Sequence, residues 1–301
     1  MSTAGMSRAG RRRLMASAFV GPALFCLLGI VLYPFLYNIY LSFTDMGLYT
    51  FKDPSIQNPF WKNYAEVLAH RELYTVFGKT LLWTGLNVFA HVAIGLFLAV
   101  LLNQPIKGRT LFRVLLILPW AMPQYISALT WRGMFNYEWG AVNHLLGMVG
   151  IAPVPWATDP FWAFVGPLIT NIWLGFPFMM IIALGGLQAI PKAVYESAEV
   201  DGAGAVRRFF SVTLPMLKPV LAPAVMLGTI WTFNNLNVIW LVSHGGEPSD
   251  RTHILVSYVY KAAFTYYRYG YAAAFGMVIF LILLGLVWLQ GRTGEATEAS
   301  W

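Results

Sequence analysis

Amide and aromatic side chains lie inside three long stretches of the chain that contain no Asp, Glu, Lys or Arg. Amides exchange hydrogen bonds with hydroxyl groups and aromatic rings offer flat apolar faces, so together they can bind an uncharged, hydroxyl-rich solute. Hydrogen bonding between helices is the alternative interpretation for each polar residue, Asn237 included. The candidates form three groups, of which the second has helical spacing: Trp120 and Gln124; Asn171, Gly175 and Phe178; and Trp231, Thr232, Asn234 and Asn235.

The sequence offers no arrangement typical of catalysis. It contains no paired carboxylates, metal-ligand cluster or nucleophile triad, and Cys26 is its only cysteine, so no intrachain disulfide can form. Gly78-Lys79-Thr80 matches the end of a phosphate-binding loop, but Leu73 stands where that motif requires glycine. We therefore expect that the chain is not an enzyme and holds no cofactor or metal.

The elements that must position the candidates are membrane-spanning helices. Hydrophobic residues make up 58% of the chain and charged residues only 11%, against roughly a quarter charged in soluble proteins. A spanning helix needs about 20 apolar residues. Six stretches without charge meet that need: Leu14–Thr44, Thr80–Ile106, Val114–Trp131, Pro160–Pro191, Pro219–Gly246 and Tyr269–Gly291. A seventh, Trp139–Thr158, holds glycines and prolines that would leave backbone groups unpaired in lipid, so we expect a short surface helix and loop there.

The basic residues predict the orientation of these spans, because Lys and Arg accumulate in short cytoplasmic segments. Six spans place 12 basic and 5 acidic residues on the side of the N-terminus, against 8 and 8 on the other. Both termini are then cytoplasmic. The net charge of +7 also suits nucleic-acid binding, but charges flanking spans account for it, and we expect no nucleic-acid partner. The expected segments are a basic N-terminus (1–13), the first span (14–44), an extracytoplasmic loop (45–79), a core of five spans (80–291) with a cytoplasmic loop (190–219), and a tail (292–301).

The cytoplasmic loop is the part of the sequence that indicates a mechanism. Pro191 suits the first turn of a helix, and Gly202 provides the permissive backbone for a tight turn after it. A second short helix, Ala203–Val212, is expected to project Phe209 and Phe210 and to end where Pro215 and Pro219 follow. This helix–turn–helix is either a docking surface for another protein or an ordinary amphipathic linker.

The residues of this loop resemble the EAA loop of binding-protein-dependent ABC importers. The match runs through Glu196-Ser197-Ala198, Asp201-Gly202-Ala203, Phe209 and the run from Leu214 to Pro219, and only Ser197 departs from the motif. The resemblance implies that the loop forms a coupling helix seated in a separate ATPase subunit, which binds and hydrolyses the ATP. The coupling residues that it implies are Glu196, Ser197, Ala198, Asp201, Gly202, Ala203, Phe209, Pro215 and Pro219.

Other segments resemble the MalF-like permeases of maltose and maltodextrin importers. They are LLILPWAMPQYISAL, FNYEWGAVN, NIWLGFPFMM and FNNLNVIWLVSHGGEP; the N-terminal third matches only in general character, without the extra helices and large external domain of some MalF proteins. The resemblance implies an all-α membrane protein with type I ABC importer permease architecture, six spans and a coupling helix. It places the sugar site at Trp120, Gln124, Asn171, Gly175, Phe178, Trp231, Thr232 and Asn235, although four of these identities differ from the family pattern, so the exact saccharide does not follow.

The resemblance also implies the surroundings of the chain. The expected partners are a second, MalG-like permease, two copies of a cytoplasmic ATPase and an extracytoplasmic sugar-binding protein, assembled in the lipid bilayer of a bacterial or archaeal plasma (inner) membrane. The expected substrate is a neutral oligosaccharide such as maltose, maltodextrin or trehalose.

Two other functions remain open from the sequence. A self-sufficient secondary carrier or channel would need an intramembrane acid if it were proton-coupled, but no span contains Asp or Glu. His91, in the middle of the second span, is better explained as a neutral, hydrogen-bonded residue. An importer for glycerol phosphates would need Arg or Lys near the pore, and the spans contain none.

Overall fold

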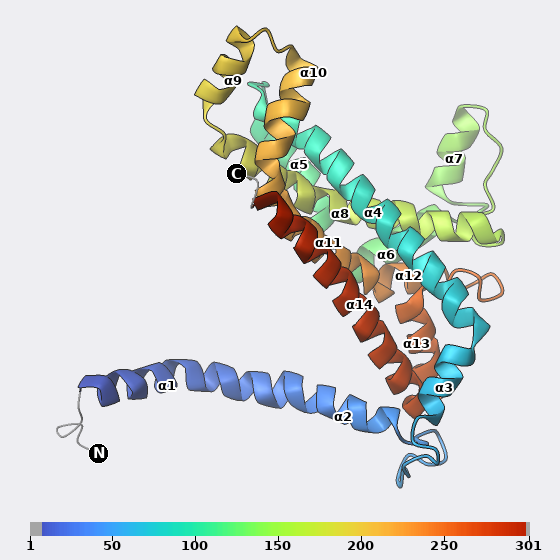
Figure 1. The fold of residues 1–301 in the computed structure, drawn as a ribbon. Helices are drawn as coiled ribbons and strands as arrows, with labels where there is room; N and C mark the ends of the chain where they lie inside the picture. The colour runs from blue at the N-terminus through green and yellow to red at the C-terminus, as the bar shows by residue number, and fades with distance from the viewer. Residues whose placement is uncertain (1–7, 299–301) are drawn as a thin grey trace. The chain divides into compact units, whose positions relative to one another are not determined.

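The computed structural model describes residues 8–298, and it is almost wholly helical (Figure 1). Within that range there is no regular strand, only an isolated antiparallel bridge between Thr44 and Ile56. The chain divides into two compact units. The first comprises the residues up to His70 together with 262–278, and the second comprises 71–261 together with the residues from Ile279 on. Residues 1–7 of the expected basic N-terminus and 299–301 of the expected tail lie outside the described residues.

The first unit contains an apolar helical segment, Ser17–Ser42, most of whose side chains are exposed, as suits a helix in contact with lipid. Its elements are α1 (Arg8–Cys26), a π-helical turn (Leu27–Leu32), α2 (Tyr33–Ser42), α3 (Lys62–Ala69) and the first part of α14 (Tyr269–Glu298). The amide of Asn63, on α3, donates hydrogen bonds to the carbonyls of Ser42 (2.9 Å) and Thr44 (2.8 Å). A bidentate ion pair joins Arg268 to Glu66 on the same helix (2.6 and 2.7 Å). These bonds hold α3 against the end of α2.

The second unit is built around one long helix, α8, which packs along α4 and also contacts α5, α6, α11 and α12. Its elements are α4 (Arg71–Asn103), α5 (Arg109–Ala121), α6 (Gln124–Met134), α7 (Ala141–Met148), α8 (Pro160–Ala189), α9 (Lys192–Val200), α10 (Ala205–Arg208), a π-helical turn (Phe209–Thr213), α11 (Leu214–Phe233), α12 (Leu236–Val242), α13 (Leu255–Phe264) and the remainder of α14. Gly95 explains the close approach of α4, because a Cβ there would lie 2.7 Å from the backbone nitrogen of Met180 on α8. Two apolar clusters therefore form along α8, around Trp83 and Leu174 and around Ala99 and Met180.

Five helices in residues 8–298 are long and apolar enough to cross a membrane, and the pair α5–α6 makes a sixth if it is one broken span. The axes of α5 and α6 differ in direction by 93°, so the third predicted span is not a straight helix. The bend falls at Met122 and Pro123, because proline disfavours a helical conformation in the residue before it and cannot donate to the preceding turn.

The fifth predicted span differs from the expectation in its bounds. The helical segment runs through Ala205–Phe233 rather than Pro219–Gly246, and α12 starts separately after Asn234 and Asn235. The side chain of Asn235 accepts a hydrogen bond from the backbone N–H of Val238 (3.2 Å), which makes it the N-cap of α12. Asparagine side chains compete with the helix for backbone groups, so the pair ends one helix and begins the next.

The segment from 190 to 219 forms the expected hairpin of helices, drawn at the same end of the second unit as the C-terminal end of α8 (Figure 1). The expected break at Pro215 and Pro219 is wrong, because α10 continues through the π-helical turn into α11. The N–H of Leu214 donates to the carbonyl of Phe209 across that turn, and Pro215 then lies in the first turn of α11, where its missing N–H is tolerated. Phe209 does not project as expected; it packs against the cluster of Ala99 and Met180, and only its neighbour Phe210 is exposed.

The seventh stretch forms the short helix α7 and a loop, as the sequence predicts. Asn143 on α7 holds that loop closed. Its amide donates to the carbonyls of Tyr137 and Val154 (3.1 Å each), and its oxygen accepts from the indole N–H of Trp156 (2.9 Å). This buried amide is therefore a structural residue of the α7 segment.

Candidate functional site

A cavity of about 420 Å³ lies in the second unit, between α5, α6, α8, α11 and the start of α12. All eight residues that the sequence proposes for a solute site line it, although they come from segments separated by more than 100 residues: Trp120, Gln124, Asn171, Gly175, Phe178, Trp231, Thr232 and Asn235. Residues on both sides of the α5–α6 break and of the α11–α12 break line this cavity. The change of backbone direction at each break brings the side chains of the two flanking helices together there. The structure thus brings the predicted set together; the role of each residue stays a prediction.

Two asparagines form the polar centre of the cavity. The amide of Asn235 donates to the side-chain oxygen of Asn171 at 2.6 Å, and both residues are buried. The amide nitrogen of Asn171 has no hydrogen-bond partner within residues 8–298. An unpaired buried donor costs about 1–3 kcal/mol, so a solute hydroxyl that accepts from this nitrogen would recover that cost.

A second amide pair crosses from α12 to α6. The side chain of Asn237 donates to the side-chain oxygen of Gln124 at 3.1 Å, and Asn234 lies beside it in the lining. The sequence names Asn234 among the candidate residues, but the eight-residue set implied by the family resemblance includes neither Asn234 nor Asn237. The Asn234-Asn235 pair could have indicated both residues. Two asparagines within an apolar run predict a helix break, and the residues after a break point in a new direction.

Aromatic rings form one wall of the cavity. The rings of Trp120 and Phe178 are stacked with centroids 6.4 Å apart, and the ring of Trp231 meets Phe178 at 5.3 Å. Each tryptophan remains half exposed. Exposed faces of rigid rings supply apolar contact area to a flat ligand at little entropic cost.

His91 completes the lining from α4, a contribution that the sequence did not indicate. Its Nε2 lies 2.9 Å from the backbone carbonyl of Asn171, and because a carbonyl only accepts, Nε2 carries the proton. The ring occupies the space beside Gly175, where a Cβ would lie 2.3 Å from it. Gly175 is therefore required because it admits the histidine to the wall of the cavity.

The lining contains no Asp, Glu, Lys or Arg. A solute that binds there receives hydrogen bonds and ring contacts but no ion pair. This composition suits a neutral ligand and offers nothing to compensate the charge of a phosphate.

The nine proposed coupling residues lie at the opposite end of α8 from its N-terminus. Seven belong to the α9–α10 hairpin and its following turn, and Pro215 and Pro219 belong to α11. No residue of α9 is buried. Gly202 adopts the left-handed conformation (φ +76°) that a tight turn requires, and no heavy atom of the chain lies within 4 Å of the position of its Cβ.

Two polar contacts hold the hairpin in shape. Arg208 pairs with Glu199 at 3.1 Å, and the hydroxyl groups of Tyr195 and Thr213 lie 3.0 Å apart. These two contacts hold α9 against the segment that follows it, while no residue of α9 is buried.

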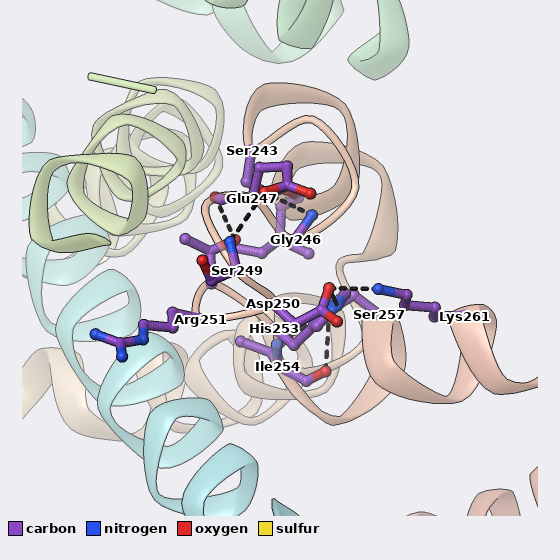
Figure 2. Close-up of polar contacts among 12 residues, drawn as sticks. Ser243, Gly246, Glu247, Ser249, Asp250, Arg251, His253, Ile254, Ser257 and Lys261 are labelled. Carbon is purple, nitrogen blue, oxygen red and sulfur yellow. Dashed lines mark hydrogen bonds and ion pairs between the residues drawn. The ribbon is translucent and has the colours of Figure 1, made fainter. Parts of the chain in front are cut away.

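Figure 2 shows a third group of polar residues, in the loop between α12 and α13. Ser257, His253 and Asp250 lie in sequence, with 3.1 Å from the hydroxyl of Ser257 to Nδ1 of His253 and 3.4 Å from Nε2 of His253 to the carboxylate of Asp250. The group is not a catalytic triad, because Ser257 is buried and its hydroxyl already exchanges bonds with the backbone of Ile254 (3.0 Å each). Within residues 8–298, no three His, Cys, Asp or Glu side chains are placed to hold a metal ion.

The surroundings of this loop favour an uncharged His253 and a charged Asp250. Burial lowers the pKa of His253, which the nearby Asp250 only partly opposes. Burial raises the pKa of Asp250, but its hydrogen bond and ion pair with Lys261, together with His253, outweigh that effect and the net pKa is lowered. At neutral pH the loop therefore contains a neutral histidine beside an ion pair.

Comparison with known proteins identifies the fold and the family. The chain is 34% identical over 286 residues to the galactooligosaccharides transport system permease protein GanP of Bacillus subtilis, an alignment that covers 90% of this chain and 68% of that one. It is 37% identical over 237 residues to the trehalose/maltose transport system permease protein MalF of Thermococcus litoralis, covering 78% and 79%. In fold it is similar to a chain of a bacterial ABC transporter involved in the import of the acidic polysaccharide alginate, with a TM-score of 0.81, 22% identity, and coverage of 95% and 96%.

Residues 91–292 match the model of the binding-protein-dependent transport system inner membrane component. That span includes the cavity, the α9–α10 hairpin and four of the candidate spans in whole or in part. The apolar helices and the relatives agree that this is a multi-pass membrane protein. The chain belongs to the family of binding-protein-dependent ABC importer permeases, with a MalF-like sequence.

Proposed function

We propose that the chain forms half of the pore of an ATP-driven importer for a neutral oligosaccharide of the maltose, maltodextrin or trehalose type. The observation that carries the proposal is the composition of the cavity on α8: buried amides, half-exposed tryptophans and no charged side chain. Two relatives whose names specify galactooligosaccharides and trehalose or maltose support a saccharide as the cargo.

The proposed coupling surface is the α9–α10 hairpin. Its exposed helix, its internal ion pair and its connection to α8 suit a rigid element seated in a separate ATPase subunit, of which two copies would bind and hydrolyse ATP. A second, MalG-like permease would complete the pore, and an extracytoplasmic binding protein would deliver the sugar. The distribution of basic residues supports a cytoplasmic position for the hairpin and for both termini.

Neither of the other functions has support from a specific contact. A proton-coupled carrier needs a titratable acid in its pathway, and the cavity is lined by none. A phosphate-bearing substrate needs a cationic partner there, and none is present in the lining.

The proposal is tested by uptake into proteoliposomes that contain the complex of this chain with its permease, ATPase and binding-protein partners. We expect ATP-dependent uptake of maltose or trehalose, no uptake of glycerol 3-phosphate, and a loss of uptake in Asn171→Ala with ATPase association intact. Uptake that follows an ion gradient without ATP, or a preference for glycerol 3-phosphate, would contradict it.

A further inference from the structure

Four buried residues of α4 lie in one row on the helix face that packs along α8. They are spaced four positions apart: Trp83, Asn87, His91 and Gly95. The ring of Trp83 meets that of Phe164 on α8 with centroids 6.0 Å apart. About two turns further along both helices, Nε2 of His91 lies 2.9 Å from the carbonyl of Asn171. The two helices therefore run in the same direction, and Asn87 lies between these contacts, close to the level of Asn171.

The amide of Asn87 can adopt only one orientation. Its Nδ2 donates to the carbonyl of Trp83 at 2.8 Å, and because a carbonyl only accepts, the two ends of the amide cannot be exchanged. The other end, Oδ1, is buried and has no hydrogen-bond partner in the described part of the chain. The α4 side of the contact with α8 therefore holds one unpaired acceptor.

The amide of Asn171 is oriented through the start of α12. Oδ1 of Asn235 accepts from the backbone N–H of Val238, so Nδ2 of Asn235 must be the end that donates to Asn171. Oδ1 of Asn171 accepts that bond at 2.6 Å, which leaves Nδ2 as its free end. This nitrogen is also buried, and it is unpaired among residues 8–298. The α8 side therefore holds one unpaired donor.

The two unpaired atoms lie where α4, α8 and the α11–α12 break meet. The indole N–H of Trp83 donates to the carbonyl of Thr232 at 3.0 Å, and the backbone N–H of Asn235 donates to the same carbonyl at 3.2 Å. A continuous series of hydrogen bonds therefore leads from Asn87 through Thr232 to Asn171. Side chains on a helix tilt toward its N-terminus, so the amide of Asn171 lies back from its own carbonyl toward the level of Asn87.

A hydroxyl group is the partner that suits this pair of atoms. It can accept one hydrogen bond and donate another, whereas a carbonyl or an ammonium group could pair with only one of the two. Buried polar groups in native proteins are nearly always paired, and ordered water commonly supplies a bond that side chains do not.

We propose that Asn87 and Asn171 bind one hydroxyl group between them, which accepts from Nδ2 of Asn171 and donates to Oδ1 of Asn87. The hydroxyl belongs to an ordered water molecule or to the saccharide itself. In both cases Asn87, which does not line the cavity around Asn171, holds the amide of Asn171 in place from the side of α4. This effect on the solute rests on the proposed function.

Electron cryo-microscopy of the reconstituted importer complex, without sugar and with maltose, tests the site directly. We expect density for one oxygen at about 2.5–3.2 Å from both Nδ2 of Asn171 and Oδ1 of Asn87. Density that is present without sugar identifies water, and density that appears only with maltose and is continuous with it identifies a saccharide hydroxyl. A direct bond between the two side chains, or no density between them in either state, overturns the proposal.

Maltose binding to the same complex in lipid nanodiscs, measured by calorimetry, tests the effect on the solute. Asn87→Leu removes the acceptor and should weaken binding about threefold to tenfold, as for the loss of one buried hydrogen bond. The matched control is Asn103→Leu, on the same helix but with an exposed side chain outside the cavity, and it should change the affinity less than about twofold. In an Asn171→Ala background, Asn87→Leu should also change the affinity less than about twofold, because it acts through Asn171.

The outcomes separate the hydroxyl site from the proposed function. An equal cost of Asn87→Leu in both backgrounds would show that the substitution only loosens the packing of α4 on α8, and it would refute the role of Asn87. If the complex does not bind maltose, or if Asn171→Ala leaves the affinity unchanged, the proposed function fails, and the density of the sugar-free complex still decides the hydroxyl site. If Asn87→Leu does not fold, the density of the unchanged complex is the deciding measurement.

Discussion

The packing of His91 against Gly175 allows a sharp prediction for Gly175→Ala. The added methyl group would lie 2.3 Å from the imidazole, well inside van der Waals contact, so the ring must move. Its movement breaks the hydrogen bond from Nε2 to the carbonyl of Asn171 and pushes the ring into the cavity. One methyl group thus perturbs both the stability of the chain and the shape of the site.

The magnitude follows from two losses and one gain. Overpacking a close-packed interior costs about 1–3 kcal/mol, and a lost buried hydrogen bond costs roughly 0.5–1.5 kcal/mol. Alanine in place of a helical glycine returns about 0.5–1 kcal/mol. The expected net destabilisation of Gly175→Ala is therefore about 2 kcal/mol, which for a chain of 301 residues corresponds to a decrease of about 3 °C in melting temperature.

The control is Gly185→Ala on the same helix, where the new Cβ would meet no heavy atom within 4 Å apart from its chain neighbours and the adjacent backbone of α8. Thermal unfolding in detergent, followed by circular dichroism, should show Gly185→Ala equal to or more stable than the parent chain. In a His91→Ala background, Gly175→Ala should lose most of its cost, since the obstructing ring is gone. A melting temperature for Gly175→Ala that matches Gly185→Ala, or an equal cost in both backgrounds, would refute the reasoning.

Three further predictions concern the hairpin and the loop after α12. Gly202→Val should abolish sugar-stimulated ATPase activity in the reconstituted complex, while Gly202→Asn should retain it. The reason is that the left-handed φ of +76° is unfavourable for a β-branched residue but is tolerated by asparagine. Equal activity of the two variants would count against a strained turn. Tyr195→Phe removes the bond to Thr213 and should cost the hairpin about 1 kcal/mol, seen as faster amide exchange in α9 alone. Because the pKa of His253 is lowered from 6.5, the unfolded loop binds a proton below pH 6.5 that the folded loop does not. Amide protection in the loop should therefore fall between pH 7 and pH 5, and a pH-independent protection would show that His253 does not titrate with opening.

The residue types of the site could be predicted from the sequence, because uncharged amides and exposed tryptophans inside apolar spans have few uses other than ligand contact or helix pairing. The turn at Gly202 was equally predictable from a glycine between two helical patterns. These features depend on local sequence, and the structure places them where the local pattern indicates.

The remaining features depend on contacts that are distant in the sequence. Nothing near Gly175 indicates that His91, 84 positions earlier, fills the space beside it. The continuation of the helix through Pro215 depends on a π-helical turn, a small change of hydrogen-bond register that composition does not specify. The end of α11 at Asn234 could have been inferred from the asparagine pair, but the apolar run on both sides favours a single helix.

The connection between α8 and α9 is only two residues, Ile190 and Pro191. Proline restricts its own φ and the conformation of the residue before it, so the backbone of this connection has little conformational freedom. The fifteen residues from Gly175 to Ala189 span about 21 Å along the axis of α8 and include Pro177; the cavity wall lies along the first part of this segment, and the hairpin follows its end. If a partner tilts the hairpin, we expect α8 to transmit that movement directly to the cavity wall beside His91.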